Sequence, residues 1–374
     1  MSDMQQFSIH FDPQHVDDLH DRLRRTRWPE AATVDDWSQG VPLTYLRELC
    51  DYWANDYDVD AAEDRLNAVP HFLHSIDGLD VHFVHVRSEH PDAMPVVLTH
   101  GWPGSFVEFL GVVEALVNPS DPADAFHVVI PSLPGYGFSA KPTKPGWGIE
   151  RIAHAWDTLM TELGYRRYAV QGGDWGAMVS TRIAQLHPDH VVGAHLNMPV
   201  VAIDPATLTD LTADEQAWLA RMADHRRWGR GYSEEQSTRP QTIGYGLIDS
   251  PVAQCAWIVE KFWAWTDNRG HPEDALSKQQ MLDNISVYWF TASAASSARL
   301  YWESLNSVNL DPVEVPTGVS VFPKEIFPLS RRWCEQRFTD LRYYNVVARG
   351  GHFAAFEQPA LFVDELRACF RGLR

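Results

Sequence analysis

Three residues of catalytic type, Asp174, Glu325 and His352, each follow a predicted β-strand. Asp174 stands at the centre of residues 172–176, a Gly-Gly-Asp-Trp-Gly turn between a β-rich run and a helical pattern. A turn of this kind lifts its central side chain above the sheet, and the usual occupant is serine. Because a carboxylate is already ionised, it attacks without a base. The turn therefore predicts a nucleophile that forms an ester with its substrate.

His352 lies in residues 349–353, Arg-Gly-Gly-His-Phe, where the glycines let the backbone turn tightly and bring the imidazole over Asp174. Since Asp174 needs no base, we expect His352 to activate the water that hydrolyses the ester. Glu325 follows the strand that ends at Phe322, and we expect it to orient His352. Asp204, beyond an earlier strand, is the rival candidate for that role.

Backbone amides complete the predicted site. The strand that ends at Thr99 is followed by residues 100–104, His-Gly-Trp-Pro-Gly. A turn of this type supplies one N–H group of an oxyanion hole, and the residue after the nucleophile supplies the other. Those groups are the amides of Trp102 and Trp175, and one such donor is typically worth about 3 kcal/mol of transition-state stabilisation.

A carboxylate nucleophile fits two classes of substrate, strained epoxides and alkyl halides. An epoxide oxygen leaves as an alkoxide and needs proton donors of high pKa, typically tyrosines, whereas a halide needs N–H donors from Trp or Asn. Tyr232 and Tyr301, in helical segments between the two halves of the predicted sheet, are candidates for the first role.

Strands and helices alternate in the segments that carry these residues, which predicts an α/β fold with a mainly parallel sheet and right-handed crossovers. The order of nucleophile, acid and histidine is that of the α/β-hydrolase fold. The expected strands are 72–76, 79–86, 95–99, 126–130, 168–171, 191–197, 317–322 and 342–347. The expected helices of this part are 106–115, 149–163, 176–187 and 359–370. Asp77-Gly78 predicts a hairpin turn, and we expect His82 and His85 on an outward face and rim of its second strand.

Four parts are expected along the chain. Residues 1–70 form a helical N-terminal meander in which Asp12 caps a first helix and a second begins near Pro42. The hydrolase core occupies residues 71–197 and 312–374. Residues 198–311 form an inserted helical cap with helices at 213–224, 251–265 and 286–301.

Composition limits the classes of function. The 374 residues are 45% hydrophobic and 22% charged, as in an ordinary globular protein, and 12% aromatic, which favours an aromatic-lined pocket for a small molecule. A formal net charge of −19 argues against nucleic acid and anionic membranes as partners. The four cysteines are widely spaced and are expected to be reduced. No secretory signal or membrane anchor is recognised, so a cytoplasmic location is expected.

The chain resembles the microsomal-type epoxide hydrolases over essentially its whole length. The matching motifs are residues 27–29, 52–53, 66–67, 82–85, 100–105, 172–176, 322–325 and 349–357. The resemblance implies that Asp174 is the nucleophile, His352 the base and Glu325 its partner, and that Tyr232 and Tyr301 activate the epoxide. It also implies that the meander helps to hold the cap over the site, and that no metal or organic cofactor is needed.

The sequence therefore predicts an epoxide hydrolase that makes vicinal diols. A haloalkane dehalogenase on the same scaffold is the first alternative, and a catalytically silent ligand-binding protein is the second. A serine esterase is disfavoured because the turn holds no serine. The identity of the epoxide, the stereochemistry and the oligomeric state, including a homodimer, are left open.

Overall fold

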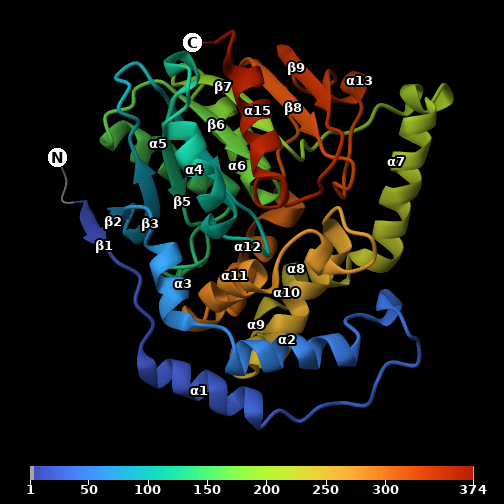
Figure 1. Cartoon of the computed structure of the whole chain (residues 1–374). Coiled ribbons are helices and arrows are strands. Elements are labelled where there is room, and N and C mark those ends of the chain that lie inside the picture. The colour runs from blue at the N-terminus through green and yellow to red at the C-terminus, as the bar shows by residue number, and fades with distance from the viewer. Residues whose placement is uncertain (1–3, 374) are drawn as a thin grey trace.

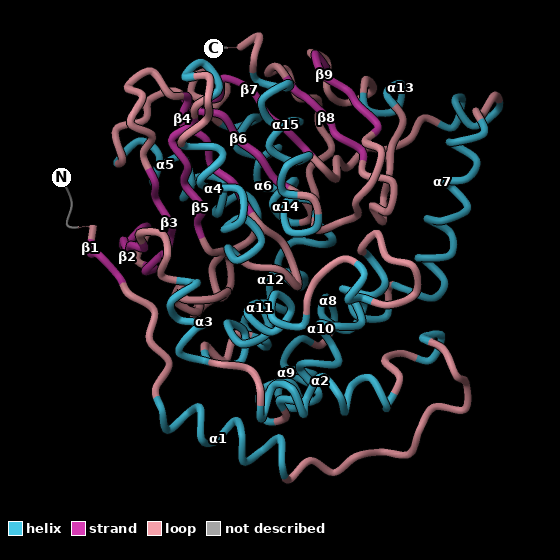
Figure 2. The backbone as a smooth tube through the Cα atoms, in the orientation of Figure 1, coloured by secondary structure: helices cyan, strands magenta, loops and turns pink. Residues whose placement is uncertain are grey.

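The computed structural model describes residues 4–373. A nine-stranded sheet runs through it in the order β1-β2-β3-β5-β4-β6-β7-β8-β9 (Figures 1 and 2). The strands are β1 Gln5–Phe7, β2 His71–Ile76, β3 Leu79–Val86, β4 Met94–Thr99, β5 Phe126–Pro131, β6 Tyr168–Gly172, β7 Val191–Leu196, β8 Thr317–Val321 and β9 Leu341–Val346. The strands from β5 to β9 pair in parallel, and β1, β2 and β3 are antiparallel. The expected mainly parallel sheet is confirmed.

Helices cover both faces of the sheet. On one face α4 (Leu110–Val117) packs against α15 (Pro359–Phe370), in front of the sheet in Figure 1. On the other face α5 (Ile149–Glu162) packs against α6 (Trp175–Leu186). These two helices connect β5 to β6 and β6 to β7, and right-handed crossovers in that direction place them opposite α4. Two short helices, α13 (Arg331–Cys334) and α14 (Ala354–Glu357), accompany the last strands.

The first 70 residues contain α1 (Pro13–Arg24), α2 (Leu43–Asn55) and α3 (Val59–Leu66). Asp12 caps α1 as expected, since its carboxylate accepts the amide hydrogen of Gln14 at 2.8 Å. The purely helical character expected for this part is wrong at β1, which pairs with β2 and extends the sheet. The sequence of β1 is too short to show the alternation that identifies a strand.

The cap helices follow β7 and precede β8; most of them lie beyond the carboxyl ends of the parallel strands, whereas the first, α7, runs alongside the sheet (Figure 1). They are α7 Ala213–Asp224, α8 Gly231–Thr238, α9 Pro240–Asp249, α10 Pro251–Trp265, α11 Lys278–Phe290 and α12 Ala294–Ser304. The single helix expected over 286–301 is wrong, because the chain breaks between α11 and α12 at Ala292, whose φ is 49°. A helix commonly ends on a left-handed residue, but that residue is usually Gly or Asn, so alanine gave no stop signal.

Polar contacts join the N-terminal segment to α11. The carboxylate of Asp283 receives two hydrogen bonds from Arg65, at 2.7 and 3.0 Å, and one from the Tyr57 hydroxyl at 2.8 Å. The Trp53 indole donates to Ser286 at 3.1 Å. A half-buried, bidentate Arg–carboxylate pair is geometrically more specific than a surface ion pair, so these contacts fix α11 relative to α2 and α3.

The hairpin of β2 and β3 turns at Asp77 and Gly78, whose φ angles of 50° and 76° suit a tight two-residue turn. The outward position expected for His82 is wrong. Its ring is fully buried, with Nδ1 2.9 Å from Ser132 Oγ and Nε2 2.9 Å from His71 Nδ1. The aromatic rings of Phe7 and Phe138 close over it, and Phe7 belongs to the unexpected strand β1.

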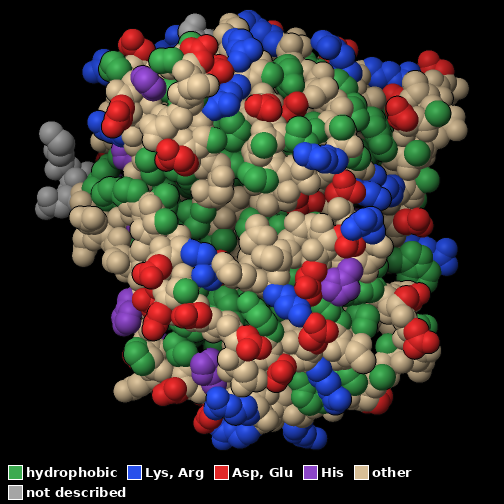
Figure 3. Space-filling view, viewed as in Figure 1, with side chains coloured by type: hydrophobic (Ala, Val, Ile, Leu, Met, Phe, Trp, Pro, Cys, Tyr) green, Lys and Arg blue, Asp and Glu red, His purple; other side chains and the backbone are tan. Residues whose placement is uncertain are grey.

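The surface in Figure 3 shows acidic and basic side chains interspersed on the face that is drawn. All four cysteines are free and buried, as expected. Among residues 4–373, no helix combines the length and the apolar character that a bilayer-crossing segment needs.

Candidate active site

The turn after β6 holds Asp174 in a conformation that few side chains adopt. Its φ of 49° and ψ of −128° lie outside the ordinary regions, at a cost of about 1–3 kcal/mol. Two glycines make the turn fit: a Cβ on Gly172 would lie 2.1 Å from the backbone of Gly176, and a Cβ on Gly176 would lie 1.8 Å from the Thr99 carbonyl oxygen. The turn thus packs against the end of β4, which brings Asp174 to the loop that follows β4.

That loop contacts the Asp174 carboxylate directly. The Trp102 amide donates a hydrogen bond to Asp174 Oδ1 at 2.8 Å, so Oδ1 occupies the position expected for an oxyanion. A Cβ on Gly101 would lie 2.3 Å from the Asp174 side chain, and only glycine permits this approach. Trp175 is the first residue of α6, and its amide belongs to the free N–H groups of a helix N-terminus.

His352 lies between the two predicted carboxylates. Its Nδ1 is 2.8 Å from Glu325 Oε1, and its Nε2 is 3.5 Å from Asp174 Oδ2. Gly351 positions the ring, because a Cβ there would lie 2.3 Å from the Trp265 carbonyl, the acceptor of the His352 amide at 2.8 Å. Asp204 lies elsewhere: its side chain caps a 3₁₀ turn by accepting from the Ala206 amide at 2.9 Å. Of the two rival orienters, Glu325 is the one in contact.

The charge state of His352 depends on its neighbours. Burial alone lowers the pKa of this imidazole, but the carboxylates of Glu325 and Asp174 outweigh that effect, and the pKa stands well above its ordinary value. The Nδ1 contact with Glu325 fixes which nitrogen faces Asp174. A base oriented by a carboxylate and aimed at a nucleophile is the arrangement expected of a catalytic triad.

Both predicted tyrosines reach the site from the cap. Tyr232 is in α8, directly after a π-helical turn (His225–Gly229), and Tyr301 is in α12. The Tyr232 ring stacks on Trp102 at 4.9 Å, and the Tyr301 ring meets Trp175 edge-on at 4.7 Å. Trp102 and Trp175, whose amides are the predicted oxyanion-hole donors, therefore also pack against the two tyrosine rings. Burial raises the pKa of each tyrosine, and the Asp174 charge adds to the effect.

A cavity of about 20 Å³ lies beside Asp174 and His352, and sequence reasoning missed one of its ionisable residues, Glu108. Loss of hydration raises the pKa of Glu108 to about 8; His352 lowers it in part, and Asp174 raises it. Glu108 lies just before α4, in a 3₁₀ turn (Phe106–Phe109) where the sequence predicted the start of a helix. The one sequence signal for it was its position in the first turn after the Gly104 loop, close to the predicted oxyanion-hole residues.

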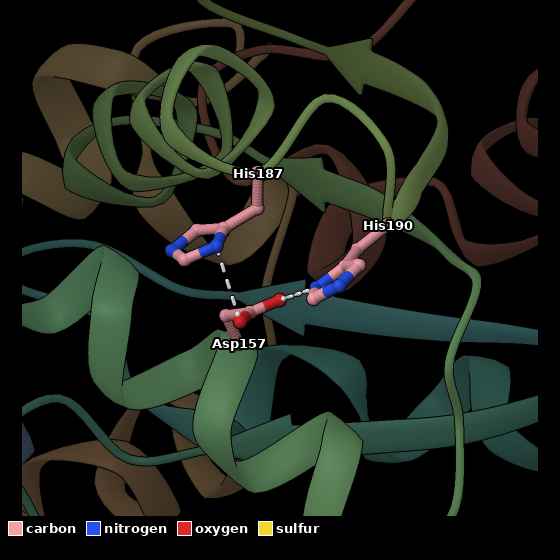
Figure 4. Close-up of side chains that lie close together, drawn as sticks. All are labelled: Asp157, His187 and His190. Atoms are coloured by element: carbon pink, nitrogen blue, oxygen red, sulfur yellow. Dashed lines mark hydrogen bonds and ion pairs between the residues drawn. The ribbon is translucent and has the colours of Figure 1, made fainter.

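One group among the described residues has metal-ligand character, and it lies away from this site. Asp157, His187 and His190 bring a carboxylate and two imidazoles within 4.8 Å of one another (Figure 4). They gather near the amino ends of β6 and β7, whereas Asp174 follows the carboxyl end of β6. This cluster is therefore separate from the proposed chemistry.

Comparisons with known proteins agree with this architecture. Residues 4–109 match the family described as epoxide hydrolase N terminus, and residues 94–359 match the alpha/beta hydrolase fold. A Stigmatella aurantiaca protein whose name places it among the epoxide hydrolases is 53% identical over 373 residues, which cover 98% of this chain and 85% of the relative. Epoxide hydrolase 1 of Oryctolagus cuniculus is 35% identical over 400 residues, covering 96% of this chain and 87% of the relative.

Solved structures give the same assignment. Juvenile hormone epoxide hydrolase from Bombyx mori superposes with a TM-score of 0.93 at 31% identity, covering 100% of this chain and 95% of that one. The Aspergillus niger epoxide hydrolase gives 0.92 at 33% identity, covering 100% and 97%. The names of these relatives do not favour the haloalkane dehalogenase alternative. The chain belongs to the epoxide hydrolase family, in its branch with an epoxide hydrolase N-terminal region and an α/β-hydrolase fold.

Proposed function

We propose that this epoxide hydrolase opens its substrate by attack of Asp174 Oδ2 on an epoxide carbon. The observation that carries the proposal is the division of the Asp174 carboxylate, with Oδ1 on the Trp102 amide and Oδ2 facing His352 Nε2. The attack forms a C–O bond to Oδ2 and breaks one epoxide C–O bond. The product of this step is an alkyl-enzyme ester that carries an alkoxide.

The alkoxide takes a proton from Tyr232 or Tyr301. Both hydroxyl groups belong to rings packed against the residues that flank Asp174, which supports their placement over its carboxylate. A raised pKa keeps each tyrosine protonated, so each can donate a hydrogen bond to the epoxide oxygen before the bond breaks.

Water completes the reaction with the aid of His352. Neutral His352 takes a proton from water at Nε2, and the water oxygen attacks Cγ of Asp174. The charge that develops on Oδ1 is stabilised by the amides of Trp102 and Trp175. Collapse breaks the bond between Cγ and Oδ2, and the diol leaves with Oδ2 and a proton returned by His352. These steps assign no metal or organic cofactor to the site.

Oxygen labelling tests the covalent route. With the enzyme in excess over an epoxide in H₂¹⁸O, the first-turnover diol is expected to contain no label, because its new oxygen comes from Asp174. Digestion and mass spectrometry should then find one ¹⁸O in the peptide that contains Asp174. A labelled diol together with an unlabelled peptide would show direct attack by water. Asp174→Ala serves as the control, which is expected to form no diol and to take up no label.

We propose that the four-part division of the chain also holds, with the cap over residues 198–311 supported by the N-terminal segment. The hydrogen bonds from Arg65 and Tyr57 to Asp283 support that role for residues 1–70. The cytoplasmic location and the homodimer stay predictions.

A further inference from the structure

The Asp157 cluster shown in Figure 4 is assembled from three elements. Asp157 lies on α5, His187 follows α6, and His190 precedes β7. His190 Nδ1 is 2.7 Å from Asp157 Oδ1, and His187 Nδ1 is 3.2 Å from Asp157 Oδ2. The turn between the two histidines is closed by a hydrogen bond from the His190 amide to the His187 carbonyl at 3.0 Å. Both imidazoles are therefore held on one side of the turn, against the carboxylate.

The spacing of these atoms is close to that of ligands on one ion. Two ligand atoms of a tetrahedral zinc site, each about 2.0–2.1 Å from the metal, lie about 3.3 Å apart. The distance of 3.2 Å between His187 and Asp157 is near this value. The distance of 2.7 Å between His190 and Asp157 is shorter and must increase when an ion binds. The exposed fraction of the His190 side chain is 42%, so an ion and its water ligands can reach the cluster from solvent.

Two further side chains, His154 and Tyr168, contact the cluster and orient its members. His187 Nε2 lies 3.0 Å from His154 Nδ1, which can accept a proton held on Nε2 when an ion takes the lone pair of His187 Nδ1. The Tyr168 hydroxyl donates to Asp157 Oδ1 at 2.6 Å and orients the carboxylate.

We propose that Asp157, His187 and His190 bind one divalent transition-metal ion of the zinc class, with water completing its coordination. His154 and Tyr168 position the ligands. The ion joins α5 to the turn between α6 and β7, at the amino ends of β6 and β7, whereas Asp174 follows the carboxyl end of β6. It stabilises the contact between α5 and this turn and takes no part in epoxide chemistry.

Calorimetric titration of the chelator-treated protein with ZnCl₂, repeated with CoCl₂ by absorbance, tests the site. Wild type is expected to bind one ion per chain. His187→Gln and His190→Gln should each remove this binding, and His154→Gln should weaken it about tenfold, because His187 then loses the residue that orients its ring. The control is His10→Gln, in an exposed pair with Glu63 that has no second histidine. Circular dichroism and diol formation should match wild type in all four variants.

Absence of one-ion binding by wild type would overturn the site and leave the cluster as a hydrogen-bonded contact between α5 and the turn. Binding that survives unchanged in His187→Gln and His190→Gln would overturn it as well, since the ion would then lie elsewhere.

A second observation concerns the cavity beside Asp174. Its volume of about 20 Å³ is enough for one water molecule. Its lining includes Gln171 and Asn197, whose side chains bond to each other at 2.6 Å. Yet Gln171 Oε1 and Asn197 Nδ2, both buried, find no hydrogen-bond partner among residues 4–373. A water molecule in this cavity could donate to the Gln171 oxygen and accept from the Asn197 nitrogen, which would satisfy both groups.

Glu108 lines the same cavity together with Asp174 and His352. Its carboxyl group lies against the backbone of Gly104, where a Cβ would come within 1.3 Å of Glu108 Oε1. The glycine of the loop after β4 thus makes room for this carboxyl group. A second carboxylate near Asp174 costs free energy, because burial and the Asp174 charge both disfavour its ionised form.

We infer that Glu108 is a positioning residue that holds the water which hydrolyses the Asp174 ester, an inference that rests on the proposed function. Glu108 accepts a hydrogen bond from this water. The other water proton goes to His352 Nε2, and the water oxygen goes to Asp174 Cγ. Glu108 itself neither gains nor loses a proton in the step.

Glu108→Gln is expected to form the ester at the wild-type rate and to hydrolyse it about 10²-fold more slowly, the effect of misplacing a reactant by about 1 Å. Rapid-quench single turnovers with intact-mass detection separate the two steps. Wild-type ester hydrolysis should rise with pH as Glu108 ionises, because the carboxylate is the better acceptor, and the variant should lack this rise. Glu114→Gln, an exposed glutamate on α4, is the control and should behave as wild type.

If wild type forms no ester, the proposed function fails. If wild type forms and hydrolyses the ester but Glu108→Gln hydrolyses it at the same rate with the same pH profile, only the role of Glu108 is overturned. A slower ester hydrolysis with an unchanged melting temperature supports positioning rather than a structural effect.

Discussion

Replacement of His352 by glutamine is expected to leave the enzyme able to form the ester and unable to hydrolyse it. Oδ2 of Asp174 attacks as a carboxylate and needs no base, so the first step survives. The second step loses its base, which typically contributes about 10²–10⁴-fold. Intact-mass spectrometry after addition of a styrene-type epoxide should show nearly complete conversion to a protein heavier by one substrate molecule.

The control variant is His85→Gln, which should show normal turnover. The ring nitrogen of His85 lies 2.9 Å from the Tyr165 hydroxyl, in a contact that includes no predicted site residue. Full turnover by His352→Gln, or loss of activity without an adduct, would contradict the division of labour between Asp174 and His352.

In the proposed mechanism, the charges around His352 account for a residue that is idle in the first step and active in the second. In the free enzyme, Asp174 and Glu325 together raise the pKa of His352 against the effect of burial. Ester formation removes the Asp174 charge and leaves only the Glu325 contribution. The imidazole therefore releases its proton more readily once the ester exists, which is when a neutral base is needed. The first chemical step thus prepares the base for the next.

The turn around Asp174 was predictable because its constraints are local. A Cβ added to Gly172 or Gly176 would lie 2.1 or 1.8 Å from backbone atoms, and such close approaches exclude every other residue type. The pairing of His352 with Glu325 was predictable for a different reason: side chains that follow parallel strands meet at one edge of the sheet. Both arguments use only strand order and residue type, and neither requires knowledge of side-chain packing.

The features that were missed depend on contacts between distant segments. His82 is polar and lies in an alternating strand, but β1 and Phe138 cover it, and no local pattern reports that cover. Glu108 lies in the 3₁₀ turn after β4, and only the packing of other segments places Asp174 and His352 around the same cavity. The Asp157 cluster needs α5 and the α6–β7 turn side by side. Tertiary packing creates these sites after the local rules have been satisfied.

Substitution of both cap tyrosines, Tyr232→Phe and Tyr301→Phe together, is expected to abolish measurable diol formation by stopping ester formation itself. Each phenylalanine keeps the ring that packs on Trp102 or Trp175 and removes only the hydroxyl. Without an acid, the epoxide oxygen must leave as a free alkoxide in a buried site, where an uncompensated charge is costly. Each single variant should slow ester formation by about 10²-fold or more, since the remaining tyrosine still donates.

Rapid-quench measurement of the adduct distinguishes this defect from that of His352→Gln. The tyrosine variants should accumulate no ester, whereas the histidine variant should accumulate it fully. The reactivity of different epoxides gives a further check. An epoxide that opens to the alkoxide of a low-pKa alcohol should lose less activity when the hydroxyl groups are removed than an aliphatic epoxide does. Tyr45→Phe, at a buried tyrosine of α2 outside the site, should leave ester formation unchanged.

A double variant that forms the ester at the wild-type rate would remove the tyrosines from the reaction. Halide release from haloalkanes by wild type, with no diol from any epoxide, would do the same, since a halide leaves without a proton. In the proposed mechanism the tyrosines therefore link substrate class to structure. Asp174 and His352 would serve any hydrolysis through an enzyme ester, and the two hydroxyl groups would restrict it to a leaving group that must be protonated.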